Sequence, residues 1–213
     1  FLQKCLAILK SEQAKLERRR LVGNILTLFI AGTDTTGKTL MDAVLALAKD
    51  KALQEKLYKE VADVNLTSLT VKELLFKVPR LKSFLHEIHR HYSLPFLFWT
   101  TKVDIPLCGG ILKRNSNLMV MLRFINTNKV RPSSAVPTPN GILQHEFDPE
   151  RYLEKQQDVL TCSSPISDGS FGAFGVGVRS CPGREYAEVL SLLVLASILQ
   201  NFDFAVAPEM SKA

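Results

Sequence analysis

The sequence lacks the usual marks of a membrane-spanning, exported or zinc-stabilised protein. No apolar run reaches the ~18 residues that a transmembrane helix needs, and no signal peptide is visible at the N-terminus. The four cysteines contain no C-x-x-C pair and no zinc-ligand spacing, which suits a reducing compartment. Internal repeats and low-complexity segments are also absent. We therefore expect that any membrane anchor lies outside this sequence.

The charge of the chain is positive but not concentrated. Its 27 Lys and Arg against 21 Asp and Glu give a formal net charge of +6. This balance permits contact with acidic partners or an anionic membrane, but the cations are too dispersed to indicate either. The densest group, at Lys4, Lys10, Lys15 and Arg18 to Arg20, is more typical of a solvated helix face than of a nucleic-acid patch. We expect no nucleic-acid partner.

The 213 residues, of which 46% are hydrophobic, are enough for one domain with a sizeable core. Hydrophobic periodicity and capping residues predict a mainly α-helical protein. We expect helices at residues 2–20, 21–49, 50–63, from 70 onward, between 79 and 95, and 186–199. We expect a small β-region at residues 96–101, 111–112 and 117–122, with turns at 109–110 and 114–115. Residues 126–145 predict a surface loop, and residues 154–173 show no clear period.

The helix expected at residues 21–49 is apolar on almost every face, which predicts a place in the middle of the protein. A polar patch, Ala31-Gly-Thr-Asp-Thr-Thr-Gly37, interrupts this apolar sequence. Each glycine in such a helix costs about 1 kcal/mol relative to alanine, so the patch calls for a compensating role. Gly32 thins one face of the helix, so that a bulky ligand can lie against the backbone.

Two threonines in this patch offer a further role. Thr35 and Thr36 can donate hydrogen bonds to the carbonyls one turn earlier and locally open the helix. The opening can hold water beside a bound ligand, with Asp34 supplying protons from solvent. Alternatively, the helix is only kinked and Asp34 pairs with Lys38 at the i,i+4 spacing. The patch taken alone favours this second interpretation.

The most informative segment is Phe174-Gly-Val-Gly-Val-Arg-Ser-Cys181-Pro-Gly183. Its pattern, F-x-x-G-x-R-x-C-x-G, specifies five positions and would arise by chance on the order of a few times in 10⁵ chains. Cysteine binds a metal as the thiolate, and a helix N-terminus favours that form through its N–H groups and its dipole. Pro182 fits the first turn of the helix that follows. The arrangement suits a thiolate ligand to an iron porphyrin.

The neighbours of this cysteine fit the same ligand. Gly175 and Gly177 let the backbone turn tightly and approach a flat molecule, and Gly183 does so one turn beyond the sulfur. Phe174 offers an aromatic wall over the sulfur, and Arg179 offers a cation for a carboxylate such as a porphyrin propionate. The competing interpretation is a cysteine that caps a helix and packs as a small hydrophobe. The complete spacing outweighs it.

A third pattern, Glu87-Ile-His-Arg90, has little weight by itself. The composition predicts about 0.6 occurrences of E-x-x-R, and an ion pair at i,i+3 on a helix surface is its ordinary explanation. The overlapping sequence His86-Glu87-x-His89 is one residue short of the zinc-binding H-E-x-x-H spacing. Its histidines would not share a helix face, so we expect no zinc site.

Together these segments resemble the cytochrome P-450 family. The cysteine segment matches all five fixed positions of the family's haem-binding loop, and Ala31 to Thr36 resembles its A/G-G-x-D/E-T-T segment. The segment Phe147-Asp-Pro-Glu-Arg-Tyr152 resembles its P-E-R-F segment. The resemblance covers nearly the whole chain. It implies a mainly α fold with a small β-region, in which residues 1–213 are a single partial domain, the C-terminal portion of the family fold, and the upstream half is absent.

The resemblance also implies roles for individual residues. The expected cofactor is haem b (iron protoporphyrin IX), with Cys181 as the axial thiolate that ligates its iron. The residues expected around the haem are Arg179, Phe174, Gly177, Gly183, Ala31 and Gly32. Asp34 and Thr35 would deliver protons for the reduction of dioxygen. Glu87, Arg90 and Arg151 would form a buried charge network that fixes the fold around the cysteine loop.

The implied activity is that of a haem-thiolate monooxygenase, which inserts one atom of dioxygen into a lipophilic substrate. Phe96, Leu97 and Phe98 would line the substrate pocket, and a flavoprotein reductase docking near Arg184 would supply electrons. The implied location is the cytosolic face of the endoplasmic reticulum, with membrane association only through a segment missing here. Trp99 stands where many members carry an arginine for a haem propionate.

Two other functions stay open at this point. The chain can be a truncated or degenerate relative without catalytic activity, which binds haem poorly or acts as an interaction module. Alternatively, Cys181 can serve as a nucleophile or redox sensor in a thiol-dependent protein. No general base with a suitable local spacing stands near Cys181 in the sequence, which argues against the thiol function.

Overall fold

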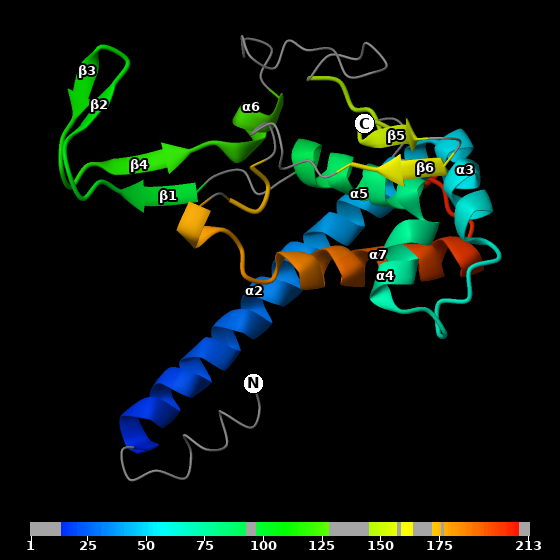
Figure 1. Ribbon diagram of the computed structural model, residues 1–213, viewed down its shortest axis with the longest axis horizontal. Coiled ribbons are helices and arrows are strands. Elements are labelled where there is room, and N and C mark those ends of the chain that lie inside the picture. The colour runs from blue at the N-terminus through cyan, green and yellow to red at the C-terminus, as the bar shows by residue number, and fades with distance from the viewer. Residues whose placement is uncertain are drawn as a thin grey trace. The chain divides into compact units, whose positions relative to one another are not determined.

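The computed structural model describes residues 14–92, 97–127, 145–156, 159–163, 172–175 and 177–208. The chain divides into two compact units, Phe1–Lys38 and Thr39–Ala213. Its described elements are mainly helices, joined by small antiparallel β-ribbons, as the sequence predicts (Figure 1). The first part of the helix expected at residues 2–20 lies outside the described residues.

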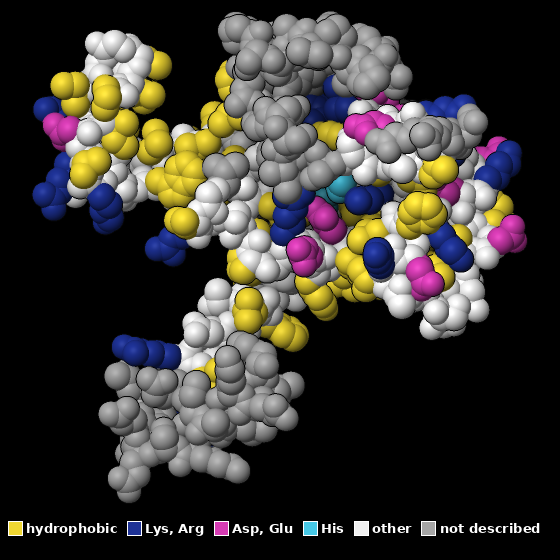
Figure 2. Space-filling view, viewed as in Figure 1, with side chains coloured by type: hydrophobic (Ala, Val, Ile, Leu, Met, Phe, Trp, Pro, Cys, Tyr) yellow, Lys and Arg dark blue, Asp and Glu magenta, His cyan; other side chains and the backbone are white. Residues whose placement is uncertain are grey.

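The long helix α2 (Ala14–Lys49) runs without interruption for 36 residues and joins two helices that were predicted separately. Figure 2 shows hydrophobic side chains at the surface along this helix. Six apolar side chains of the first unit are between 47% and 74% exposed: Val22, Ile25, Leu26, Leu28, Phe29 and Ile30. The prediction that this stretch is buried on all sides is therefore wrong for the first unit. The physical reason is that the described residues of this unit consist of α2 alone, so no neighbouring element of the unit covers them.

The other predicted helices belong to the second unit, and two of them begin where their capping residues indicate. Asp50 caps α3 (Lys51–Val61), because its carboxylate accepts a hydrogen bond from the Leu53 N–H at 2.9 Å. Thr70 and Glu73 form a capping box at the start of α4 (Val71–Lys77). The remaining two predicted helices are α5 (Pro79–Tyr92) and α7 (Arg184–Asn201).

The hydrophobic core of the second unit lies where α3, α5 and α7 pack together with the last turns of α2. Leu47, Leu57, Phe84, Leu85 and Leu195 are all at most 1% exposed. Burying one such side chain contributes about 1.5–3 kcal/mol. This core fixes α5 against α7, the two helices that carry most of the groups around the cysteine loop.

The described part of the second unit also contains three two-stranded antiparallel ribbons. Their strands are β1 (Leu97–Thr100) with β4 (Asn117–Val120), β2 (Ile105–Leu107) with β3 (Gly110–Leu112), and β5 (Leu153–Gln156) with β6 (Val159–Cys162). The sequence predicted β1, β3 and β4 but not β2, nor the ribbon in residues 153–162. Helix α6 (Leu122–Thr127) begins where the last predicted strand was expected to end.

Candidate active site

The cysteine loop immediately precedes α7. That helix begins at Arg184, with Gly183 as its N-cap residue. Pro182 was expected in the first helical turn, but it precedes the N-cap residue Gly183. Cys181 therefore lies two residues before the N-cap. The Cys181 side chain is exposed and its thiol is free. A Cβ added to Gly183 would lie 3.9 Å from the Cys181 sulfur, so this glycine keeps one side of the sulfur open.

Backbone hydrogen bonds hold the loop in shape. The Cys181 N–H donates to the Phe174 carbonyl at 2.8 Å, and the Ser180 N–H donates to the Gly177 carbonyl at 3.0 Å. Gly175 and Gly177 have φ values of 72° and 69°, in the left-handed region that residues with a Cβ rarely adopt. The predicted tight turns at these two glycines are therefore confirmed.

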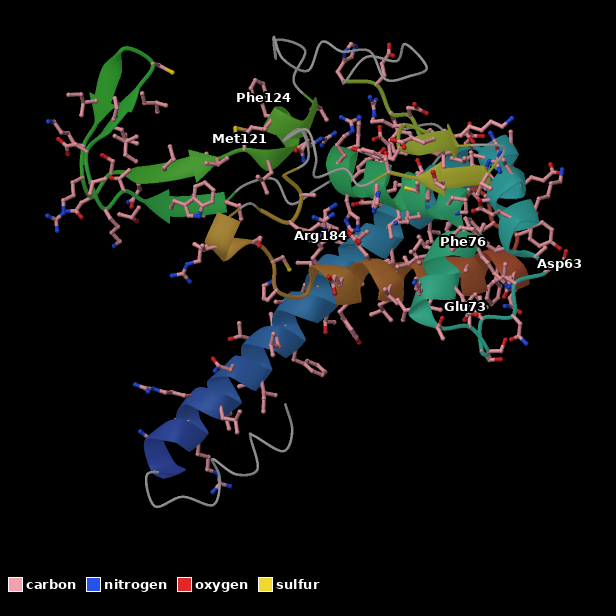
Figure 3. All side chains as sticks on the ribbon, viewed as in Figure 1. Asp63, Glu73, Phe76, Met121, Phe124 and Arg184 are labelled. Atoms are coloured by element: carbon pink, nitrogen blue, oxygen red, sulfur yellow. The ribbon has the colours of Figure 1, made fainter. Side chains whose placement is uncertain are left out.

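The ring of Phe174 lies between two groups from different helices. The ring of His89 on α5 is 4.7 Å from it, centroid to centroid, and the Arg184 guanidinium on α7 is 5.3 Å from its centroid. Figure 3 labels Arg184 near the start of α7. The Arg184 Nε in turn donates to the Glu188 carboxylate at 2.9 Å. Phe174 thus connects the cysteine loop to both helices. Its expected place over the sulfur of Cys181 stays a prediction.

His86 and His89 were given no role from the sequence, yet both are buried, and His89 lies beside the cysteine loop. Burial, with the charge of Arg184, lowers the pKa of His89 to about 3, so its imidazole is neutral near pH 7. Its Nε2 has no hydrogen-bond partner among the described residues. The i,i+3 spacing of the two histidines, which places them on one face of α5, is the signal that could have found them.

His86 contacts a different cysteine from the one in the loop. Its Nδ1 lies 3.7 Å from the Cys162 sulfur, and its Nε2 lies 3.9 Å from a Glu188 carboxylate oxygen. Burial raises the pKa of Cys162 to about 12 and lowers that of His86 to about 3. Both groups therefore stay neutral at pH 7, and the pair does not supply a thiolate nucleophile.

Glu87 and Arg90 form the centre of a buried ion-pair network, as the sequence predicts. Both are at most 1% exposed, and the Glu87 carboxylate accepts from Arg90 Nη2 at 2.6 Å and from Arg90 Nε at 2.7 Å. Arg151 Nε donates to the same carboxylate at 3.2 Å, and the Asp148 N–H does so at 2.8 Å. The predicted contacts among these three charged residues are confirmed.

This network reaches the start of the cysteine loop through one amide side chain. Arg90 Nη1 donates to the Asn126 carbonyl at 2.6 Å, and the Asn126 side chain donates back to the Arg90 carbonyl at 3.3 Å. The Asn126 side-chain oxygen then accepts from the Gly172 N–H at 2.9 Å. The network therefore joins α5, α6 and the entry to the loop by hydrogen bonds, which is a structural role.

The polar patch of α2 lies in the first unit. The Thr35 hydroxyl donates to the Ala31 carbonyl at 2.6 Å, which confirms the predicted bond. The helix nevertheless stays continuous through the patch, so the predicted local opening is not seen. Ala31, Gly32, Asp34 and Thr35 are all exposed, and a Cβ added to Gly32 would meet no atom within 4 Å.

The structure thus groups the predicted site residues in two sets. Cys181, Phe174, Gly177, Gly183 and Arg179 form one loop of the second unit, where Arg179 is exposed at the end of a short 3-10 turn, Gly177–Arg179. The α2 residues belong to the first unit.

The three residues expected to line a substrate pocket do not act as one group. Leu97 is half-buried, and its Cδ1 would lie 3.8 Å from a Cβ at Gly175, so it packs against the cysteine loop. Phe98 is exposed on the opposite face of β1, because successive strand residues alternate. Phe96 lies outside the described residues.

A free cysteine on a glycine-containing loop ahead of an apolar helix, together with a buried Glu–Arg network, is the arrangement expected of a mainly helical haem-thiolate protein. The family model named Cytochrome P450 matches residues 1–213, so the chain belongs to the cytochrome P450 family. This family binds haem. The described helices include none that is both long and apolar enough to cross a membrane.

Individual relatives cover nearly all of the chain. It is 31% identical over 199 residues to human "Sterol 26-hydroxylase, mitochondrial", covering 92% of the chain and 35% of that relative. It is 28% identical over 212 residues to "Cytochrome P450 2M1" of Oncorhynchus mykiss, covering 96% and 38%. It is 30% identical over 218 residues to "Cytochrome P450 736A117" of Prunus mume, covering 99% and 39%. The chain therefore spans between 35% and 39% of the length of these relatives.

Proposed function

We propose that this chain carries the haem-ligating and proton-delivering residues of a haem-thiolate monooxygenase. The reaction combines a lipophilic substrate, dioxygen, two electrons and two protons to give a hydroxylated product and water. The observation that carries the proposal is the exposed Cys181 thiol on a loop with two left-handed glycines, in which the Cys181 backbone N–H donates to the Phe174 carbonyl.

The residues of the loop fit haem b. Cys181 offers a single soft ligand at the surface of the described residues, and Gly183 leaves space beside its sulfur. The backbone at Gly175 and Gly177 presents no side chain to a flat ligand. Arg179 is exposed at the end of the short 3-10 turn that begins at Gly177, and it offers a cation for a haem propionate. Haem bound in this way would supply the activation of dioxygen.

In this proposal the chain's own residues hold the ligand and move protons. Cys181 releases its proton when it binds the metal, because only the thiolate is a ligand. The Thr35 hydroxyl donates to the Ala31 carbonyl, which orients its oxygen to accept a further hydrogen bond. Asp34 is exposed next to it and exchanges protons with solvent. The pair can therefore relay protons from water toward the reacting oxygen.

The substrate and the electron donor are proposed on narrower grounds. Leu97, packed against Gly175, gives the loop an apolar neighbour, which favours a lipophilic substrate. Arg184 and Arg179 place positive charge beside the cysteine loop, which favours an acidic flavoprotein reductase as electron donor. The proposed location is the cytosolic face of the endoplasmic reticulum. Fractionation tests the location, since several relatives are named as mitochondrial.

A carbon monoxide difference spectrum tests the ligand assignment. The chain is expressed with haem supply, reduced, and exposed to carbon monoxide. We expect a red-shifted Soret band of the thiolate type, which Cys181→Ser abolishes. Cys108→Ser, at another exposed free cysteine, is the matched control and retains the band. Failure of the folded chain to take up haem would favour a non-catalytic relative, and an unchanged band in Cys181→Ser would reject the assignment.

A further inference from the structure

Arg184 occupies a position that the helix itself disfavours. It is the first residue of α7, at the positive end of the helix dipole, where anions are stabilised and cations are not. Glu188 pairs with it at the i,i+4 spacing, and the order with the cation on the N-terminal side is the less favourable one for an ion pair on a helix. Helix energetics therefore do not account for an arginine here, and its contacts with the rest of the second unit must do so.

The contacts of Arg184 join the cysteine loop to the first turns of α7. Its guanidinium lies 5.3 Å from the centroid of the Phe174 ring, and its Nε donates to the Glu188 carboxylate at 2.9 Å. Glu188 is placed in turn against α5, because one of its carboxylate oxygens lies 3.9 Å from His86 Nε2. The carbonyl of Phe174 accepts the Cys181 N–H. The ion pair is therefore one residue away from the backbone bond that shapes the cysteine loop.

The ion pair is largely shielded from solvent. The side chains of Arg184 and Glu188 are 22% and 16% exposed. In the ordinary i,i+4 pair on α3, the side chains of Lys59 and Glu55 are 70% and 66% exposed. Exposed charges are screened beyond about 10 Å at ordinary salt, whereas partly buried charges are screened much less. The charge of Arg184 does reach the interior, since it adds to burial in lowering the pKa of His89 to about 3.

The charges of this pair act at the same end of α7 as the helix dipole. Cys181 lies two residues before the N-cap of α7, where the N–H groups and the dipole favour its thiolate. Arg184 adds a full positive charge at that end, and Glu188 offsets it one turn further along. A metal centre bound at Cys181 becomes more negative by one charge when it takes up an electron. The balance of charge beside it therefore affects how readily it is reduced.

We propose that Glu188 is a positioning residue that sets the reduction potential of haem bound at Cys181. Glu188 holds Arg184 against the ring of Phe174 and offsets its positive charge, so that the iron is reduced less readily than it would be beside Arg184 without this carboxylate. This inference rests on the proposed function, because it requires haem bound through the Cys181 thiolate.

An equilibrium redox titration of the haem-loaded chain, followed in the Soret band, measures this potential without a reductase. Glu188→Gln removes the negative charge beside Arg184 and should raise the potential. Arg184→Gln removes the positive charge and should lower it. We expect each change to alter the ratio of ferrous to ferric haem about tenfold at a fixed applied potential, which corresponds to ~59 mV for one electron.

The double variant, Arg184→Gln with Glu188→Gln, separates charge balance from structural damage. It removes one charge of each sign, so the ratio should return to within about twofold of the parent value. Damage to the loop would instead accumulate in the double variant. The matched control is Glu185→Gln, the same chemical change at an exposed carboxylate in the same turn of α7. It should alter the ratio less than about threefold, because solvent screens that charge.

The carbon monoxide spectrum and circular dichroism of every chain distinguish two failures. A parent chain without the thiolate-type Soret band overturns the proposed function and this inference with it. Where the band is present, only this inference is overturned if the two single variants shift the potential in the same direction, or if Glu185→Gln shifts it as far as Glu188→Gln. If Glu188→Gln does not fold, Arg184→Gln decides alone, and a raised or unchanged potential in that variant overturns the inference.

Discussion

Replacing Glu87 by glutamine should remove a large fraction of the stability of the second unit. The Glu87 carboxylate is fully buried and accepts hydrogen bonds from Arg90, Arg151 and the Asp148 N–H. A glutamine side chain is neutral and keeps one acceptor oxygen, so two guanidinium groups lose their counter-charge in a buried site. Removing one partner from such a network costs about 3–5 kcal/mol. The whole free energy of unfolding of a domain is about 5–15 kcal/mol, so the loss is a large fraction of it.

Urea unfolding of the parent chain and the variant measures this loss directly. The control is Glu55→Gln, which breaks the exposed i,i+4 ion pair between Glu55 and Lys59 and should leave the unfolding midpoint nearly unchanged. In a double-mutant cycle, Glu87→Gln and Arg90→Gln together should cost clearly less than the sum of the two single changes. Equal effects of Glu87→Gln and Glu55→Gln, or additive effects in the cycle, would refute the reasoning.

Three further predictions concern the core, the buried histidines and the exposed helix. Leu47→Ala should cost about 2–5 kcal/mol in urea unfolding, whereas Leu45→Ala, at a 41% exposed position of the same helix, should cost much less. The pKa of His89 is about 3 in the folded chain against an ordinary value of 6.5. The unfolded chain therefore binds more protons between these values, and stability is lost as the pH falls through that window, by about 1.4 kcal/mol per pH unit for each such histidine. His89→Phe, which keeps a ring against Phe174, should flatten this dependence in urea titrations at pH 7, 6 and 5, and an unchanged slope would contradict the assignment. The exposed apolar side chains of α2 should make the chain self-associate in sedimentation velocity, and Phe29→Ser should reduce this; a monodisperse, cooperatively melting monomer would contradict it.

Local signals in the sequence were sufficient for the starts of α3 and α4 and for part of the site. Asp50 and Thr70 mark helix starts because a cap satisfies N–H groups within three residues of itself. The bond from Thr35 to the Ala31 carbonyl follows from the i,i+4 geometry of a helix. The turns at Gly175 and Gly177 follow from the conformational freedom of glycine.

Features that depend on contacts between residues far apart in the sequence could not be predicted from local signals. The strands of the β5–β6 ribbon are four residues each and show no period that separates them from a loop. The position of His89 beside Phe174 arises because α5 and the cysteine loop, far apart in sequence, fold together. The exposure of Phe29 contradicts an interpretation based on composition alone, since burial requires a partner as well as an apolar side chain.

The central claim is that Cys181 is the protein ligand of a haem iron, and X-ray absorption at the iron edge tests it most directly. The haem-loaded chain should show one sulfur neighbour in addition to the porphyrin nitrogens. Cys181→Ser should lose that sulfur, whereas Cys162→Ser, at the half-buried thiol beside His86, should keep it. An iron with only nitrogen or oxygen neighbours in the parent chain, or a sulfur neighbour that persists in Cys181→Ser, would contradict the claim.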